Sequence, residues 1–279
     1  MCGIFGFEEL NAKTRRMAHY LAFAMEFRGD DSWGASDGHD WIKRGHAVTE
    51  DFVIPVGWKA GIFHTRGASV GSITDANAHP FIVGEGKDRI IGIHNGGVSN
   101  HAEMNRRYDR HCEVDSEHIF LHMVEGKPLH ELAGRGTIVW WNRNVIHLAR
   151  WNFGDLEICS TEEDGVIFCS NREPIERAAR MCGVKIKQFY QKLVDGYDHI
   201  IKDHSVYKQE RLSVSNYQFD NDTRWGRTVK SWADAGVSAL GLSRAGEAKC
   251  RRCHNQWTKR LICDGCIAEM RKAFTGVTA

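Results

Sequence analysis

The chain begins Met1-Cys2-Gly3-Ile4-Phe5-Gly6, and this stretch governs the interpretation of all that follows. Residues 3–7 form a short apolar run, which is typical of a buried β-strand. Cys2 stands directly before this run, and its small side chain favours removal of Met1. Removal would leave a thiol and a free α-amine on one residue. That amine, with a reference pKa of about 7.7–8.0, can take the thiol proton as a general base.

Five further motifs follow the N-terminal stretch. They are Arg28-Gly29-Asp30-Asp31-Ser32, His64-Thr65-Arg66-Gly67-Ala68-Ser69-Val70-Gly71, Asn77-Ala78-His79-Pro80, His94-Asn95-Gly96-Gly97-Val98-Ser99-Asn100-His101 and Asp115-Ser116-Glu117. In order and spacing, the six motifs resemble the class II glutamine amidotransferases, the N-terminal-nucleophile (Ntn) glutaminases, such as the glutaminase domain of glucosamine-6-phosphate synthase. The resemblance covers roughly residues 2–180. It implies an α+β fold, a four-layer αββα sandwich, and hydrolysis of L-glutamine to glutamate and ammonia.

The resemblance also implies a set of catalytic groups. Cys2 would be the nucleophile that attacks the side-chain amide of glutamine and forms a thioester. The Asn95 side-chain amide and the Gly96 backbone N–H would stabilise the oxyanion, and both are suitable hydrogen-bond donors for it. Arg28 would lie near the Cys2 terminus. Catalysis would need no cofactor.

The substrate-binding residues follow from the same resemblance. Arg66 would hold the α-carboxylate of glutamine, because its planar guanidinium matches a carboxylate at two points. Asp115 would supply a carboxylate for the α-ammonium group. Gly67 and Ser69 belong to the loop that closes over glutamine in the family. Here Gly67 stands where many relatives have Trp, and the three residues from Ser69 on replace Thr-His-Gly, which leaves open how this lid closes.

Composition excludes several classes of protein. The 279 residues are 42% hydrophobic and 26% charged, with a net charge of +1, which is ordinary for a globular protein in water. No run approaches the ~18 consecutive apolar residues of a membrane span. The N-terminus lacks the basic and apolar regions of a secretory signal. We therefore expect a cytoplasmic protein without a membrane partner, located in the host cytoplasm if a virus encodes it.

The nine cysteines are the one compositional anomaly. Their odd number and the lack of an export signal disfavour a disulfide framework. Four of them are isolated in the sequence and are expected in the core, namely Cys112, Cys159, Cys169 and Cys182. The last four form two CxxC pairs joined by nine residues, namely Cys250, Cys253, Cys263 and Cys266.

Two CxxC pairs can present four thiolates to one tetrahedral zinc ion. Four thiolates leave no open coordination position, so this zinc would be structural and would supply folding energy to a very small domain. The predicted organisation is a class II amidotransferase domain over residues 2–215, a polar linker over 216–245 and a zinc-ribbon-like module over 246–279. Unliganded cysteines and a redox CxxC are the alternatives to zinc.

The C-terminal segment differs in charge from the rest of the chain. Residues 241–279 carry eight Lys or Arg and three Asp or Glu, whereas the preceding residues carry a formal charge of −4. Trp257 lies among four basic residues, Arg251, Arg252, Lys259 and Arg260. A basic surface with an aromatic residue suits nucleic acid or an acidic protein. The alternative is a solvated module that docks on the catalytic domain.

The expected partners are L-glutamine and an ammonia-accepting synthase. No such synthase domain fits in the roughly 100 residues after position 180, so we expect a glutaminase subunit that passes ammonia to a separate enzyme. The acceptor could be a nucleobase or another small metabolite. Two alternatives stay open: another Ntn amidohydrolase, which Arg66 and Asp115 disfavour, and an inactive Ntn domain that serves as a zinc-dependent nucleic-acid or protein binding module.

Periodicity predicts the main helices and strands. The expected elements are a helix over 10–27, strands at 61–64, 90–94 and 166–169, a hairpin of 137–142 with 145–151, a helix that Asp115 caps, and a helix from Pro174. Trp140 and Trp141 are adjacent in the hairpin, so one is expected in the core and one on the surface. Hydrogen-bonded structural roles are favoured over a metal site for three histidines, His64, His79 and His94.

Overall fold

The structure is a computed structural model that describes residues 2–154, 156–163, 165–212, 248–249 and 257–258. The chain divides into two compact units, Met1–Tyr217 and Gln218–Ala279. In the second unit, β14 (Ala248–Lys249) pairs antiparallel with β15 (Trp257–Thr258). The proposed zinc ligands and the proposed linker over 216–245 lie outside the described residues, so the predicted zinc module stays a prediction.

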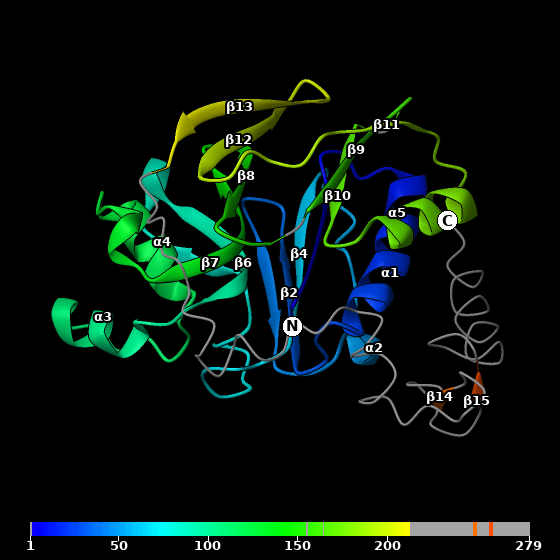
Figure 1. Ribbon diagram of the computed structural model, residues 1–279. Helices are drawn as coiled ribbons and strands as arrows, with labels where there is room; N and C mark the ends of the chain where they lie inside the picture. Colours follow the sequence, from blue (N-terminus) through cyan, green and yellow to red (C-terminus); the bar gives the residue numbers. More distant parts are fainter. Residues whose placement is uncertain (1, 155, 164, 213–247, 250–256, 259–279) are drawn as a thin grey trace. The chain divides into compact units, whose positions relative to one another are not determined.

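Two antiparallel sheets form the centre of the first unit (Figure 1). The first has the strand order β11-β9-β10-β1-β4-β2-β3. Its strands are β1 (Gly3–Phe7), β2 (Ser32–Ser36), β3 (Trp41–Arg44), β4 (Gly61–Arg66), β9 (Glu157–Thr161), β10 (Val166–Cys169) and β11 (Ile186–Phe189). The N-terminal strand β1 therefore lies in the middle of its sheet, between β10 and β4.

The second sheet has the strand order β13-β12-β8-β7-β6-β5. Its strands are β5 (Phe81–Val83), β6 (Ile90–Val98), β7 (Gly134–Asn142), β8 (Val145–Trp151), β12 (Tyr197–Lys202) and β13 (Ser205–Arg211). The β6–β7 pair of this sheet is long and runs from Ile90 opposite Asn142 to Val98 opposite Gly134.

Helices cover the outer faces of both sheets, as Figure 1 shows. On the first sheet lie α1 (Ala12–Glu26), α2 (Val48–Asp51) and α5 (Arg172–Cys182). On the second lie α3 (His101–Tyr108) and α4 (Glu117–Val124). Two short 3-10 helices complete the unit, η1 (Gly86–Asp88) and η2 (Leu129–Glu131). Among the described residues, no helix has the length and apolar character needed to cross a membrane.

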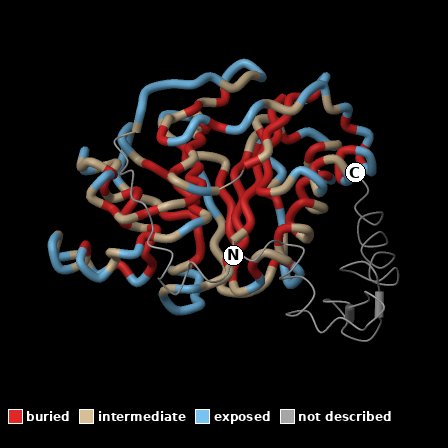
Figure 2. The backbone as a smooth tube through the Cα atoms, viewed as in Figure 1, coloured by how far each residue is buried: buried red, intermediate tan, exposed pale blue. Residues whose placement is uncertain are grey.

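Three hydrophobic clusters fill the spaces between the helices and the two sheets. One packs α1 and α5 on the first sheet and includes Leu21 and Phe63. The second lies between the sheets and includes Ile93 and Phe168. The third packs α4 on the second sheet and includes Phe120. Figure 2 shows the buried residues concentrated along the strands of both sheets. The mixed fold of stacked antiparallel sheets between helices, expected from the sequence, is therefore present.

The predicted hairpin of β7 and β8 is confirmed, and its turn shows why the sequence signals it. Asn142 pairs with Val145, and the two residues between them, Arg143 and Asn144, have φ of 48° and 62°. Two left-handed residues in a two-residue turn match the right-handed twist of the flanking strands.

The expectation for the adjacent tryptophans is wrong, because both are buried. Trp140 is 5% exposed and packs under α4, whereas Trp141 is 7% exposed and packs between the sheets. Successive strand residues face opposite sides of a sheet. Since helices cover one face of this sheet and the other sheet covers the second face, neither side is open to solvent.

Two helix starts also differ from the sequence prediction. Helix α4 has Ser116 rather than Asp115 at its N-cap position. The Asp115 carboxylate instead accepts a hydrogen bond from the Val98 backbone N–H. Helix α5 begins at Arg172, so Pro174 lies in its first turn, where its missing N–H costs no intrahelical bond.

Candidate active site

Cys2 lies at the start of the central strand of the first sheet. Gly3 pairs with Thr65 of β4, which places Cys2 beside Arg66 and Gly67. The Cys2 side chain is half-buried, and its Sγ lies 3.8 Å from the Gly67 carbonyl oxygen. A side chain at Gly3 would collide with Thr65 Oγ1, since its Cβ would lie 2.6 Å away. The terminus is therefore held against β4 by a close backbone approach.

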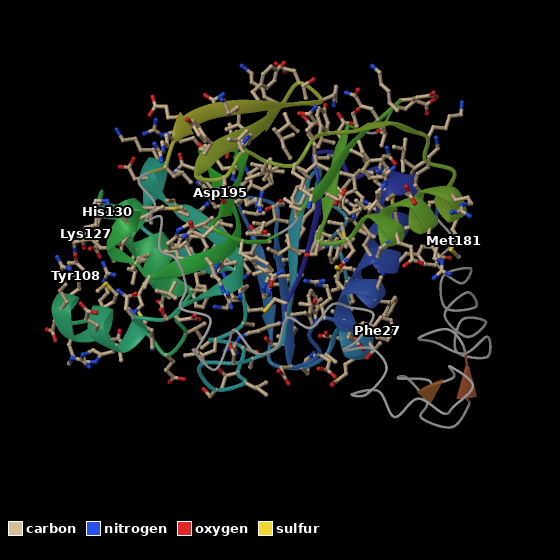
Figure 3. The ribbon with its side chains drawn as sticks, in the orientation of Figure 1. Phe27, Tyr108, Lys127, His130, Met181 and Asp195 are labelled. Atoms are coloured by element: carbon tan, nitrogen blue, oxygen red, sulfur yellow. The ribbon has the colours of Figure 1, made fainter. Side chains whose placement is uncertain are left out.

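Arg28 fixes the Cys2 backbone. Helix α1 ends at its C-cap Phe27, labelled in Figure 3, and Arg28 follows directly. The Arg28 Nε donates to the Cys2 carbonyl oxygen at 2.8 Å. Its terminal nitrogen donates to Asn171 Oδ1, also at 2.8 Å. The sequence prediction that Arg28 lies near the Cys2 terminus is thus confirmed in position, and Asn171 is a partner that sequence reasoning did not assign.

The motif that contains Arg28 also holds the segment after β4. The Asp31 carboxylate accepts a hydrogen bond from the Ala68 backbone N–H at 2.7 Å, and the Asp31 N–H donates to the Arg66 carbonyl oxygen at 3.0 Å. A Cβ on Gly29 would lie 2.1 Å from the Gly67 nitrogen, so only glycine allows this approach. Asp31 is therefore a structural support for the loop that begins at Gly67.

Arg66 ends β4 and is almost completely buried, with 3% exposure. One terminal nitrogen of its guanidinium donates to the Ser72 carbonyl oxygen at 3.1 Å, and the other donates to the Val70 carbonyl oxygen. The loop therefore wraps around the guanidinium. Gly67 is half-buried, whereas Ser69 is exposed.

Asp115 directly precedes Ser116, the N-cap residue of α4, and its side chain contacts the end of β6 in the second sheet. Its Oδ2 accepts from the Val98 N–H at 2.7 Å, and its Oδ1 accepts from the Ser116 N–H at 2.9 Å. The side chain is 7% exposed. Gly97 passes close to it, since a Cβ there would lie 3.5 Å from the same Oδ2. Asp115 is thus a buried carboxylate beside the glycine pair of β6.

Asn95 and Gly96 reach the same end of the structure through a bond between the sheets. His64 Nε2 of β4 lies 3.1 Å from the His94 carbonyl oxygen of β6. Asn95 follows His94 directly in β6, and Arg66 stands two residues after His64 in β4. The bond between the two histidines therefore brings Asn95 and Arg66 to the same end of the sheets. Gly96 lies opposite Gly136, and a Cβ on it would lie 1.9 Å from the Arg135 carbonyl oxygen. Gly96 is therefore required for close backbone packing.

The histidines of these motifs are buried and differ in their contacts. His94 Nδ1 lies 2.9 Å from Ser116 Oγ, and its Nε2 lies 3.0 Å from the Arg135 carbonyl oxygen. The His79 ring lies against the His64 ring with centroids 4.0 Å apart, but its nitrogens have no hydrogen-bond partner within the described part of the chain. The expected hydrogen-bonded role thus fits His64 and His94 and not His79.

Burial keeps these rings neutral. It lowers the pKa of His64 to about 3 and holds the pKa of His79 well below the usual value. It also lowers the pKa of His94, an effect that the nearby Asp115 opposes. In the residues that the structure describes, no group of three or more His, Cys, Asp or Glu side chains is arranged to hold a metal ion.

The Cys2 thiol is under the influence of two opposite charges, those of Arg66 and Asp115. Burial raises its pKa, while its hydrogen bond to Gly67 and the positive charge of Arg66 lower the pKa and Asp115 raises it further. Burial raises the pKa of the isolated cysteines as well, to about 12 for Cys159 and for Cys169. They are buried, as expected from the sequence, and a thiol of this kind is inert.

The predicted site residues therefore divide into three sets. The structure brings seven of them to one end of the two sheets, namely Cys2, Arg28, Arg66, Gly67, Asn95, Gly96 and Asp115. Ser69 lies on the exposed part of the loop. The four cysteines proposed as zinc ligands lie outside the described residues. Asp31 belongs to the motif of residues 28–32, so the sequence draws attention to it. Asn171 belongs to no motif, and the sequence indicates only that it follows a strand.

Comparison with known families and proteins gives one consistent similarity. Residues 54–135 match the family model described as class-II glutamine amidotransferases. The glutamine–fructose-6-phosphate aminotransferase (isomerizing) of Symbiobacterium thermophilum is 27% identical over 188 residues, which cover 63% of this chain and 29% of that protein. The amidophosphoribosyltransferase of Archaeoglobus fulgidus is 25% identical over 251 residues, which cover 78% of this chain and 53% of that protein. The chain thus spans about half or less of these relatives.

A solved structure has a similar fold. The glutamine phosphoribosylpyrophosphate (PRPP) amidotransferase from B. subtilis, solved in complex with ADP and GMP, superposes with a TM-score of 0.56. The match covers 75% of this chain and 49% of that one, at 18% sequence identity. At this identity the likeness concerns the fold alone.

Proposed function

We propose that this chain, which carries a class II glutamine amidotransferase domain, hydrolyses L-glutamine to glutamate and ammonia with Cys2 as its nucleophile. The observation that carries the proposal is the position of Cys2. It stands at the start of a central strand, with its carbonyl oxygen bound by Arg28 and its Sγ at Gly67. Arg66 and Asp115 act electrostatically on the same sulfur.

The α-amine of Cys2 would be the general base once Met1 has been removed. Because burial raises the pKa of the Cys2 thiol, the thiol needs a base to ionise at neutral pH. His64 is a poor base, since its pKa is lowered to about 3. The amine, with a reference pKa of about 7.7–8.0, is matched to this task.

The proposed reaction has two stages. The amine takes the thiol proton, and the Cys2 sulfur forms a bond to the side-chain amide carbon of glutamine. The tetrahedral intermediate then loses its nitrogen, which receives the proton from the ammonium group and leaves as ammonia. Water attacks the resulting thioester, and glutamate departs as the sulfur recovers a proton. The Asn95 amide and the Gly96 N–H would stabilise both oxyanions, because fixed donors need no reorganisation during the reaction.

Arg66 and Asp115 would select free glutamine over other amides. Each terminal nitrogen of the Arg66 guanidinium carries two hydrogens. Ser72 and Val70 accept one each, which leaves the other pair for the α-carboxylate. The Asp115 carboxylate would receive the α-ammonium group. This pair of opposite charges favours an amino acid over an acyl substrate without an α-ammonium group.

The test measures glutamate released from L-glutamine by purified protein whose N-terminal residue has been established as Cys2. The wild-type protein should turn over, and Cys2→Ala should lose all activity while its circular dichroism is unchanged. Cys182→Ala, which alters a buried cysteine of α5 away from the site, should keep it. Glutamate release by Cys2→Ala at the wild-type rate would disprove the assignment. No turnover by the wild-type protein would favour an inactive domain.

We also propose that the ammonia is passed to a separate synthase and that Cys250, Cys253, Cys263 and Cys266 hold one structural zinc ion. The spacing of the cysteines supports the zinc proposal, and the antiparallel pairing of Lys249 with Trp257 brackets the first CxxC pair in the sequence. Elemental analysis should find one zinc per chain and none after both CxxC pairs are changed to Ser. The basic charge of this segment supports contact with nucleic acid, which a filter-binding assay at two salt concentrations would test.

A further inference from the structure

The loop over residues 69–77 covers the Arg66 side chain but is itself largely exposed. It follows β4 and leads to β5. Its residues 71–76 are all exposed, so hydrophobic burial contributes little to holding it in place. Polar contacts must therefore determine its position. Gly67, two residues before the loop, has no side chain with which to anchor it.

Glu113 supplies the densest group of these contacts. Its Oε2 accepts from Ser72 Oγ at 2.7 Å and from Asn77 Nδ2 at 2.7 Å. The Asn77 amide also donates to Ser72 Oγ at 2.8 Å and to the Ser72 carbonyl oxygen at 3.2 Å. One carboxylate thus ties two points of the loop together. Hydrogen bonds to an ionised carboxylate are stronger than those between neutral groups.

Ser72 connects this carboxylate with the substrate-binding arginine. Its hydroxyl donates to Glu113, and its carbonyl oxygen accepts from the Arg66 guanidinium at 3.1 Å. Glu113 in turn stands two residues before Asp115. Residues 113–115 and Ser72 therefore connect Arg66 with Asp115, the two charged side chains proposed to bind glutamine.

Gly71 gives independent evidence that the loop is built to meet this segment. Its φ is +82°, a conformation that favours glycine. A Cβ there would lie 2.8 Å from the Glu113 carbonyl oxygen and 2.9 Å from Val114 Cγ2. The loop and the segment before Asp115 therefore approach each other at backbone distance.

The other side of the loop is tied to the end of β3. The Lys43 ammonium group donates to the Ala76 carbonyl oxygen at 2.5 Å. The Gly45 N–H donates to Asp75 Oδ1 at 2.6 Å. With these anchors fixed, Glu113 controls the remaining side of the loop, the side that contacts Arg66.

We propose that Glu113 is a positioning residue that latches the 69–77 loop through Ser72 and Asn77 and so holds Arg66 in the orientation that receives the α-carboxylate of glutamine. The inference rests on the proposed glutaminase function and adds to it a residue that sets glutamine affinity.

The test compares kinetics on two substrates. Glu113→Ala should raise the KM for L-glutamine about tenfold while kcat changes less than about threefold, because charge-assisted hydrogen bonds that order the binding group are lost. On 4-aminobutanamide, which lacks the α-carboxylate, the variant should match the wild-type kcat/KM. Ser72→Ala should raise the KM for glutamine in the same direction, and the double variant should be no worse than Glu113→Ala alone. Glu103→Ala, an exposed site on α3, is the matched control and should behave as wild type.

Several outcomes would overturn the latch. A KM for glutamine that is unchanged in Glu113→Ala would show that the carboxylate does not position Arg66. An equal loss on glutamine and on 4-aminobutanamide would indicate a general structural effect. Additive losses in the double variant would show that Glu113 and Ser72 act separately. A wild-type protein without glutaminase activity would overturn the proposed function and this role with it, whereas an active wild type with an unaffected variant would overturn only the latch.

Discussion

Acid should destabilise the fold through His64. The side chain is 1% exposed, its Nε2 lies 3.1 Å from the His94 carbonyl oxygen, and burial lowers its pKa from 6.5 to about 3. In the folded protein the ring therefore stays neutral down to about pH 3. In the unfolded chain it takes up a proton below pH 6.5. Acid thus favours the unfolded state, and the stability that is fully present above pH 6.5 is lost as the pH falls.

The size of the effect follows from the pKa difference. Each pH unit between the two pKa values changes the free energy of unfolding by about 1.4 kcal/mol. Between pH 6.5 and pH 5, the His64 contribution alone should therefore fall by about 2 kcal/mol, and by pH 3 by about 5 kcal/mol. Typical domains have a free energy of unfolding of about 5–15 kcal/mol, so a loss of this size is easily measured.

The assay is urea unfolding followed by tryptophan fluorescence at pH 7 and pH 5. His64→Gln keeps an amide that can donate to His94 but cannot titrate. It should be less stable than wild type at pH 7 and should lose about 2 kcal/mol less between pH 7 and pH 5. His39→Gln, at an exposed position, should keep the wild-type pH dependence. An identical loss in His64→Gln and wild type would show that His64 does not cause the pH dependence. If His64→Gln does not fold, an imidazole NMR titration of the wild type decides, and a His64 pKa near 6.5 would refute it.

Three other predictions concern the site. Gly96→Ala should destabilise the protein by several kcal/mol, because its Cβ would lie 1.9 Å from the Arg135 carbonyl oxygen. Gly97→Ala should cost less than about 1 kcal/mol, because the atom nearest to its Cβ would lie 3.5 Å away. Thermal unfolding compares the two variants, and equal losses of stability would contradict this packing difference. Asn171→Ala removes a hydrogen-bond acceptor of Arg28 and should lower kcat about tenfold with little change in KM, while Asn171→Asp should retain activity. An unchanged kcat in Asn171→Ala would show that Asn171 does not support Arg28 in catalysis. Since the proposed general base, the α-amine of Cys2, has a reference pKa of about 7.7–8.0, kcat/KM should rise between about pH 6 and pH 8 as the amine loses its proton, and a flat profile would argue against a base-assisted thiol.

Local patterns predicted the elements that local chemistry determines. The apolar run after Cys2 is the strand β1, and the Asn-Arg-Asn sequence forms the turn between β7 and β8. In both cases the residues that determine the structure are neighbours in the chain. Asp115 shows where such reasoning ends, because its carboxylate binds the Val98 N–H across the end of β6 rather than capping α4.

Contacts between distant parts of the chain could not be predicted in this way. Arg28 and Asn171 are separated by 143 positions, and Ser72 and Glu113 by 41. The sequence predicts one buried and one open face for Trp140 and Trp141, but burial of the second face depends on packing of the other sheet. Motifs thus identified the groups proposed for catalysis, whereas the residues that hold those groups emerged only from the folded arrangement.

The most direct test of the central claim asks which atom reacts with a glutamine-shaped electrophile. The protein is incubated with 6-diazo-5-oxo-L-norleucine, digested and mapped by mass spectrometry. We expect one adduct per chain, on Cys2 at a processed N-terminus, which excess L-glutamine prevents and which Cys2→Ala lacks. An adduct on another residue, or loss of glutamine turnover after treatment while Cys2 stays unmodified, would contradict this role of Cys2.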